Sequence, residues 1–157
     1  MSGQAAHIGL ATLADVDALA SLETRLFFTD RCSRRIFWPV IRRQAVTVLR
    51  NDEACAILGY AILLARRNSG KMRLYSFGIV EEARRQGLAK ILLYHLEEMA
   101  RAAGKHTLTL EVGDGNLAAL SFYRRHGFTQ YGFRLHYYED GGHAILMKKP
   151  LAEVPEP

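Results

Sequence analysis

The amino-acid sequence predicts an α/β fold in which a mixed β-sheet carries helices on both faces. Three stretches indicate this fold. Residues 76–104 combine a buried strand, a short polar loop and a long amphipathic helix, residues 45–80 form a β-meander, and residues 107–149 give a strand, a helix and two closing strands. For 157 residues the simplest organisation is one domain, residues 1–150, with a frayed tail at residues 151–157.

Composition and charge limit the function classes. The formal charge of +5 and the pI of about 9.4 favour anionic ligands, but the basic residues are scattered, which disfavours nucleic acid as a partner. The histidines are dispersed and the two cysteines lie far apart, so we expect no metal. The sequence has no apolar signal core and no apolar run of membrane-spanning length, so we expect a cytoplasmic protein with no membrane partner. A monomer or a homodimer is expected.

The first elements of the chain are short. Residues 7–12 predict a strand, Asp15 precedes a short helix, and a second short helix runs through Trp38. The aromatic side chains of Phe28 and Trp38 either line a pocket or pack beneath a loop, and the sequence leaves both readings open.

The meander and the central helix follow. Alternating apolar residues and turn-forming residues predict strands over residues 45–49, 54–66 and 71–80, with Cys55 as a small buried residue. The helix begins at Leu88 and ends at Gly104, a typical C-cap residue. Its predicted buried stripe is Leu88, Ile91, Leu92, His95, Leu96, Met99 and Ala100.

The start of this helix is suited to an anion. The first turn of a helix leaves backbone N–H groups unpaired and carries the positive end of the helix dipole. Gly87 lets the backbone approach a ligand closely, and Arg84 and Arg85 add positive charge. The alternative is a solvated helix start without a ligand, because this short motif is neither a Walker loop nor a dinucleotide fingerprint.

Three polar residues gather in the second half of the chain. Glu111 ends the predicted strand over residues 107–112, and Asn116 caps a helix that runs to Arg125. Tyr123 lies seven residues after Asn116, so the two side chains share a helix face. A carboxylate, an amide and a phenol therefore lie near a strand end, where open α/β sheets bind ligands. Taken singly, each residue also has a purely structural explanation: Glu111 as an exposed strand residue, Asn116 as a helix cap and Tyr123 as a packing residue.

The last elements are two strands, over residues 128–138 and 143–149, joined by the turn residues 139–142.

Three motifs together resemble the GNAT superfamily of acyl-CoA-dependent N-acetyltransferases. They are Arg84-Arg85-Gln86-Gly87-Leu88-Ala89, Leu110-Glu111-Val112 and Asn116-x-x-Ala119-x-x-x-Tyr123-x-x-x-Gly127-Phe128. The resemblance is greatest to the bacterial ribosomal-protein N-terminal alanine acetyltransferases, which share the ending Tyr137-Tyr138-x-x-Gly-x-x-Ala144-x-x-Met147.

The resemblance implies a mostly antiparallel central sheet whose strands part at the cofactor site, and it implies roles for particular residues. Main-chain groups of Phe77, Gly78 and Ile79 would pair with the pantetheine arm of acetyl-CoA. The cofactor would also contact Asn116 and Tyr123, and its pyrophosphate would bind the amides of Arg84, Arg85, Gln86, Gly87, Leu88, Ala89 and Lys90. Glu111 would be the general base, Tyr123 would lie beside the thioester sulfur as an acid, and the acceptor groove would be flanked by Phe28, Trp38, Tyr137 and Tyr138.

The expected reaction is direct transfer of an acetyl group from acetyl-CoA to a protein or peptide N-terminal amine. An α-amine, with a pKa of about 7.7–8.0, is appreciably neutral at pH 7, whereas a lysine amine, with a pKa of about 10.4, is almost fully protonated. The alternatives left open are a lysine side chain or a small amine as acceptor, a non-catalytic acyl-CoA-binding module, and a basic protein that associates with RNA.

Overall fold

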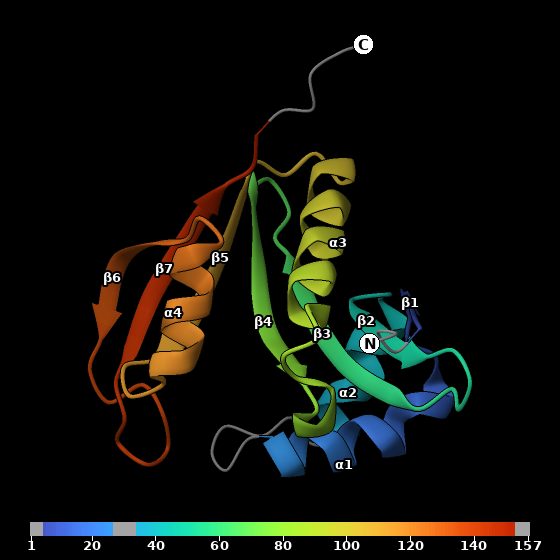
Figure 1. Ribbon diagram of the computed structural model, residues 1–157. Coiled ribbons are helices and arrows are strands. Elements are labelled where there is room, and N and C mark those ends of the chain that lie inside the picture. Colours follow the sequence, from blue (N-terminus) through green and yellow to red (C-terminus); the bar gives the residue numbers. More distant parts are fainter. Residues whose placement is uncertain (1–4, 27–33, 153–157) are drawn as a thin grey trace. The chain divides into compact units, whose positions relative to one another are not determined.

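The computed structural model describes residues 5–26 and 34–152 (Figure 1). The elements are β1 (Ala6–Leu10), the 3₁₀ turn η1 (Leu13–Asp15), α1 (Val16–Leu26), α2 (Arg34–Arg42), β2 (Val46–Asn51), β3 (Ile57–Ala65), β4 (Lys71–Ile79), the 3₁₀ turn η2 (Glu81–Ala83), α3 (Leu88–Ala102), β5 (Thr107–Gly113), α4 (Leu117–Arg125), β6 (Thr129–Arg134) and β7 (Ala144–Pro150). Seven strands form one sheet in the order β1-β2-β3-β4-β5-β7-β6.

The predicted fold class is confirmed. Strands β4 and β5 pair in parallel, whereas the pairs β1–β2, β2–β3, β5–β7 and β6–β7 are antiparallel. The parallel register pairs Lys71 to Arg73 of β4 with Thr107 to Thr109 of β5, and the splayed strand pair at the cofactor site stays a prediction. Within the described residues, no helix is long and apolar enough to cross a membrane.

The chain divides into two compact units. The first unit comprises Met1–Leu63 and Ser76–Leu96, and the second comprises Leu64–Tyr75 and Glu97–Pro157. Strand β4 and helix α3 contribute residues to both. The organisation as a single domain over residues 1–150 stays a prediction.

The first unit is built around strands β2 and β3, whose central residues are almost all buried. Such continuous apolar runs are typical of strands covered on both faces. Phe37 from α2 packs edge-to-face on Tyr60 of β3, with ring centroids 5.8 Å apart, and neither side chain is exposed. The two aromatic residues of the second predicted helix therefore differ in burial: Phe37 packs in the core, whereas Trp38 is 47% exposed.

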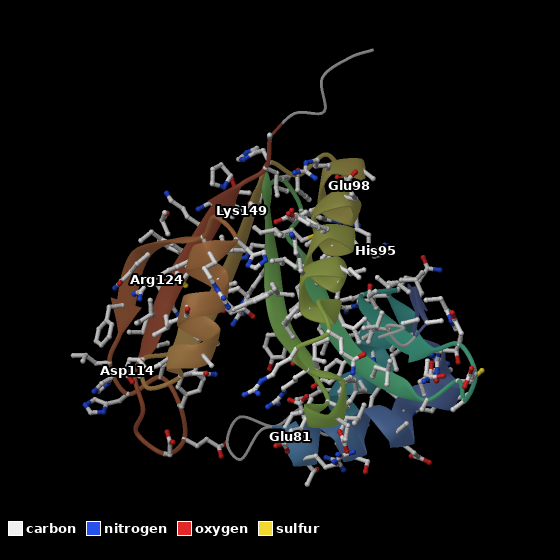
Figure 2. The ribbon with its side chains drawn as sticks, viewed as in Figure 1. Glu81, His95, Glu98, Asp114, Arg124 and Lys149 are labelled. Atoms are coloured by element: carbon white, nitrogen blue, oxygen red, sulfur yellow. The ribbon has the colours of Figure 1, made fainter. Side chains whose placement is uncertain are left out.

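The buried face of α3 differs from the predicted stripe. Leu88, Leu92, Leu96 and Ala100 are buried as predicted, but Ile91 is 52% exposed and the neighbouring position Leu93 is fully buried. The core face is thus rotated by part of a turn from the one predicted. His95 is half-buried and Glu98 is exposed on the same helix (Figure 2).

The second unit is ordered around β5, whose residues alternate between buried and half-buried, as expected for a strand with one covered face. All seven residues of β5 pair with β7, from Thr107 opposite Pro150 to Gly113 opposite Ala144. The carboxylate of Glu97, only 2% exposed, is compensated by Lys149 of β7, which is labelled in Figure 2, with Nζ 2.5 Å from Oε1. A buried carboxylate without such a partner would be strongly destabilising.

Two further predictions are wrong in detail. The last-but-one strand ends at Arg134 rather than at residue 138, because His136 has a positive φ of 51° and a tight turn closes between Tyr138 and Gly142. Cys55 is exposed rather than buried. It lies in the turn before β3 with a φ of 53°, where its N–H donates to the carbonyl of Asn51.

Candidate functional site

In the first unit, the predicted anion site is the loop between η2 and α3. Gly87 has a φ of 76°, in the left-handed region that favours glycine, and Arg85 also lies in this region with a φ of 64°. Two left-handed residues so close together turn the chain sharply into the helix. Leu88 anchors the helix start in the core, whereas Ala89 is half-buried and Lys90 is exposed.

The backbone N–H groups of residues 85–90 have no acceptor among the described residues. The N–H of Arg84 still donates to Glu81, and the first helical bond of α3 runs from the N–H of Ile91 to the carbonyl of Gly87. Between these two bonds, consecutive donors have no partner within residues 5–26 and 34–152. Successive free N–H groups at a helix start bind anions through the main chain and the helix dipole.

The side chains of this loop are partly committed to the protein itself. The Nε–H of Arg84 donates to the carbonyl oxygen of Ile79 at 3.1 Å, and the amide of Gln86 donates to the carbonyl of Glu82 at 3.5 Å. Arg85 is exposed. The main chain of β4 at Phe77, Gly78 and Ile79 precedes this loop, and the carbonyl of Ile79 already accepts one hydrogen bond.

Of the two residues in the N-terminal half that were predicted to flank the acceptor groove, the structure describes one. Trp38 lies on α2, with the guanidinium carbon of Arg42 5.4 Å from the centre of its ring. Phe28 lies outside the described residues.

In the second unit, Glu111 lies on β5 and forms an ion pair with Arg73 of β4. The Nε–H of Arg73 donates to Oε2 of Glu111 at 3.0 Å, and an Nη2–H donates to the hydroxyl oxygen of Tyr137, also at 3.0 Å. Arg73 pairs with Thr109 in the parallel register, which brings it near the carboxylate two residues further along β5. The structure therefore brings together Glu111 and Tyr137, and it joins them through Arg73.

The sequence did not identify Arg73. A charged residue within the apolar strand predicted over residues 71–80 is a weak signal by itself. Its significance comes from the parallel register of β4 and β5, which sequence patterns do not specify.

Tyr123 is a buried residue of α4, 8% exposed. Its ring packs edge-to-face on Phe128, with centroids 5.4 Å apart. Burial raises the pKa of the hydroxyl, and the negative charge that Tyr138 acquires on ionisation raises it further. Tyr123 therefore stays protonated at neutral pH, which is the state that a proton donor needs.

Asn116 is the N-cap of α4, as predicted. Its Oδ1 accepts a hydrogen bond from the N–H of Ala119 at 3.2 Å. Because this contact uses the oxygen of the amide, the Nδ2–H groups are the part of the side chain that can donate to a ligand.

Tyr137 and Tyr138 lie in the loop over residues 135–143. Their rings meet edge-to-face with centroids 5.0 Å apart, and both are half-buried. The loop is closed by a hydrogen bond from the N–H of His136 to Nδ1 of His143 at 3.0 Å. Among the described residues, no group of three or more His, Cys, Asp or Glu could hold a metal ion.

Comparisons with known proteins identify the family. Residues 13–128 match the sequence model of the Acetyltransferase (GNAT) family. An N-acetyltransferase of Methanocaldococcus jannaschii, described as uncharacterized, is 32% identical over 146 residues, 90% of each chain. The ribosomal protein bS18-alanine N-acetyltransferase of Salmonella typhimurium is 35% identical over 82 residues, 50% of this chain and 55% of that protein. The match thus spans about half the length of this relative.

A solved structure extends the likeness to nearly the whole chain. The crystal structure of the ribosomal-protein-S18-alanine N-acetyltransferase from Escherichia coli has a TM-score of 0.82 and 26% sequence identity, covering 97% of both chains. Both the predicted fold and the predicted enzyme class, an N-acetyltransferase of the GNAT type, agree with these relatives. The chain belongs to the acetyltransferase (GNAT) family.

Proposed function

We propose that the protein transfers the acetyl group of acetyl-CoA to the N-terminal α-amine of a protein or peptide. Membership of the family supports the acyl donor, and the names of two relatives, both ribosomal-protein alanine N-acetyltransferases, support a protein as the acceptor. The observation that carries the proposal is the run of backbone N–H groups over residues 85–90 that have no acceptor in the described part of the chain.

Those N–H groups suit the pyrophosphate of CoA. A diphosphate offers several anionic oxygens to consecutive donors, and a binding site made of main chain costs no side-chain entropy. Phe77, Gly78 and Ile79 of β4 supply main-chain groups for the pantetheine arm, and Asn116 supplies its Nδ2–H groups. The exposed guanidinium of Arg85 adds attraction for the phosphates.

In this proposal, Glu111 is the general base. The attacking amine must be neutral, and an α-amine with a pKa of about 7.7–8.0 needs only modest help at pH 7. As the amine nitrogen bonds to the carbonyl carbon, its proton passes to Glu111, directly or through a water molecule. One carboxylate oxygen is already held by Arg73, which leaves the other for this proton.

The remaining steps concern the oxyanion and the leaving group. The N–H of Ile79 is the proposed donor to the tetrahedral oxyanion. When the carbon–sulfur bond breaks, the thiolate takes a proton from the hydroxyl of Tyr123. The thiol of CoA has a pKa of roughly 8.5, by analogy with cysteine, so its thiolate is a better leaving group than an alkoxide. Protonation by Tyr123 therefore contributes only modestly to the rate.

The acceptor would lie beside Tyr137 and Tyr138, with Trp38 as a further contact. Half-buried tyrosines offer a flat apolar face and a polar tip, which suits a peptide main chain. The role of Phe28 in acceptor binding stays a prediction.

The test is release of CoA from acetyl-CoA in the presence of a peptide library that varies the first residues. Lysine-blocked peptides and polyamines serve as controls. Preference for a free α-amine supports the proposal. Transfer to lysine or to polyamines alone would mean that the acceptor is a lysine side chain or a small amine and not an α-amine. Binding of acetyl-CoA without CoA release on any acceptor would favour a non-catalytic module.

A further inference from the structure

Arg73 links three separate segments of the second unit. It lies on β4, its Nε–H donates to Glu111 of β5, and its Nη2–H donates to the hydroxyl of Tyr137 in the loop over residues 135–143. The guanidinium carbon also lies 5.2 Å from the centre of the Tyr75 ring. Its hydrogen-bond partners are 38 and 64 residues away in sequence, so the contacts depend on the tertiary fold.

We propose that Arg73 is a positioning residue that fixes the proposed base Glu111 and the acceptor-loop residue Tyr137 in one orientation. This inference rests on the proposed function and gives a role to a residue that the sequence patterns did not single out. Arg73 touches neither substrate in this role but acts through its two partners.

The first consequence concerns the carboxylate. A fixed guanidinium N–H binds Oε2 and so restricts rotation of the Glu111 side chain. Among the residues that the structure describes, Glu111 has no second hydrogen-bond partner, so Oε1 remains available to a water molecule or an amine. Arg73 thereby separates the two oxygens into one that is anchored and one that reacts.

The second consequence concerns the hydroxyl of Tyr137. An arginine can only donate, so the hydroxyl oxygen accepts from Nη2 and its own proton points elsewhere. The phenol therefore presents a donor. Its natural partner is a carbonyl oxygen, which a peptide acceptor carries next to its α-amine.

The charge of Arg73 is secure in this position. Burial by itself would lower the pKa of the guanidinium, but the attraction of Glu111 and the contacts with Tyr137 outweigh it, and the pKa is raised. Arg101 and Glu98 provide a contrast, because they are three residues apart on α3 and the carboxylate side chain is 67% exposed. Such an exposed local pair contributes little.

A kinetic experiment tests the role, with Arg134 as a matched control. Arg134 is exposed and its guanidinium carbon lies 5.9 Å from the centre of the Tyr137 ring, but it makes no contact with Glu111. Arg73→Ala is expected to lower kcat by about 10²-fold, the loss typical of a misplaced catalytic group, with the KM for acetyl-CoA unchanged. Arg134→Ala is expected to retain wild-type kcat.

Chemical rescue separates positioning from structural damage. Added guanidinium, at concentrations that do not unfold the protein, should restore part of the kcat of Arg73→Ala and leave Arg134→Ala unaffected. Arg73→Lys should retain more activity than Arg73→Ala, but less than wild type, because lysine lacks the planar fork. Wild-type kcat in Arg73→Ala, an equal loss in Arg134→Ala, or failure of rescue in the folded variant would overturn the proposal.

A second measurement needs no turnover. The Nε–H resonance of Arg73, identified in the ¹⁵N spectrum by its loss in Arg73→Lys, should shift in Glu111→Gln and Tyr137→Phe but not in Arg134→Ala. An unshifted resonance in Glu111→Gln would overturn the positioning role alone, even in an active enzyme. Absence of CoA release from the wild-type protein on every acceptor would instead overturn the proposed function, and the positioning role with it.

Discussion

The two units offer ligands different kinds of groups. In the first unit, the donors of the candidate site are consecutive main-chain N–H groups at the start of α3. In the second unit, the groups proposed to react are side chains, namely Glu111 with Arg73, and Tyr123. A site made of main-chain groups tolerates most side-chain substitutions and depends on backbone conformation. A site made of side chains can lose its reactivity when a single atom is replaced.

The units also contain contrasting arginine–carboxylate pairs. Asp15 in the first unit accepts from Arg50 through Oδ2 and from the N–H and hydroxyl of Thr12, and its side chain is 11% exposed. Glu111 in the second unit accepts only from Arg73 among the described residues, and its side chain is 16% exposed. Three donors therefore converge on Oδ2 of Asp15 and tie this carboxylate to the fold, whereas Oε2 of Glu111 has a single donor, and we propose that Glu111 takes part in proton transfer.

The largest effect is expected at Glu111. Glu111→Gln keeps the shape of the side chain but removes its ability to accept a proton, so kcat should fall by about 10²–10⁴-fold. The deficit should be greatest at low pH, where the amine is protonated and most needs a base. The measurement is the pH–rate profile with a peptide acceptor. An identical profile in wild type and variant would contradict the role of base.

Tyr123 is expected to have a smaller effect. Tyr123→Phe removes the hydroxyl and keeps the packing on Phe128, so folding should be preserved. Because a thiolate leaves readily, we expect kcat to fall about 10²-fold at most, at the lower end of the range for acid catalysis. The affinity for acetyl-CoA, measured by calorimetry, should change little. Unchanged turnover would remove Tyr123 from the mechanism.

Gly87 tests the main-chain site of the first unit. Gly87→Ala meets no atom within 4 Å but must adopt a φ of 76°, which costs about 1–2 kcal/mol for a residue with a Cβ. If the loop relaxes when empty, binding must restore the strained turn, and the affinity for acetyl-CoA should fall roughly five- to thirtyfold. kcat at saturating acetyl-CoA should be close to that of wild type.

Gly104 is the matched control for this substitution. It has the same φ of 76° and the same open surroundings, but it follows the other end of α3. Gly104→Ala should lower thermal stability by a similar amount and leave acetyl-CoA affinity unchanged. Equal affinities in the two variants would show that the loop before α3 has no special part in binding.

The sequence predicted most accurately those features that depend on neighbours along the chain. The glycine-containing turn before α3, the N-cap at Asn116 and the alternation in β5 depend on residues only a few positions apart, and all three lie as predicted. The roles proposed for these residues in binding and catalysis stay predictions.

Features that depend on distant segments were not predicted. Glu97 is buried because Lys149 lies opposite it, and nothing near Glu97 in the sequence indicates this partner. Arg73 acquires its place beside Glu111 from the register of a parallel strand pair. The exposure of Ile91 has the same origin, because the packing partners of α3 determine which part of a broad apolar stripe faces the core.

The smallest effect on catalysis is expected at Asp15. Burial by itself raises the pKa of this carboxyl, but hydrogen bonds from Arg50 and Thr12 and the attraction of the guanidinium outweigh it, so the pKa lies below the ordinary value of 3.8. The group therefore stabilises the folded state above that ordinary value, and the contribution is lost as the pH falls through the lower pKa of the folded state.

Asp15→Asn should accordingly reduce the free energy of unfolding by about 1.5–3 kcal/mol at neutral pH, the range for a hydrogen bond to a charged group. The difference from wild type should shrink as the pH falls below about 4, since the wild-type carboxyl then becomes protonated and loses the same interaction. Urea unfolding at several pH values measures this, and kcat and both KM values should match wild type. A loss of turnover in the folded variant would mean that this carboxylate also contributes to function, and the contrast with Glu111 would no longer hold.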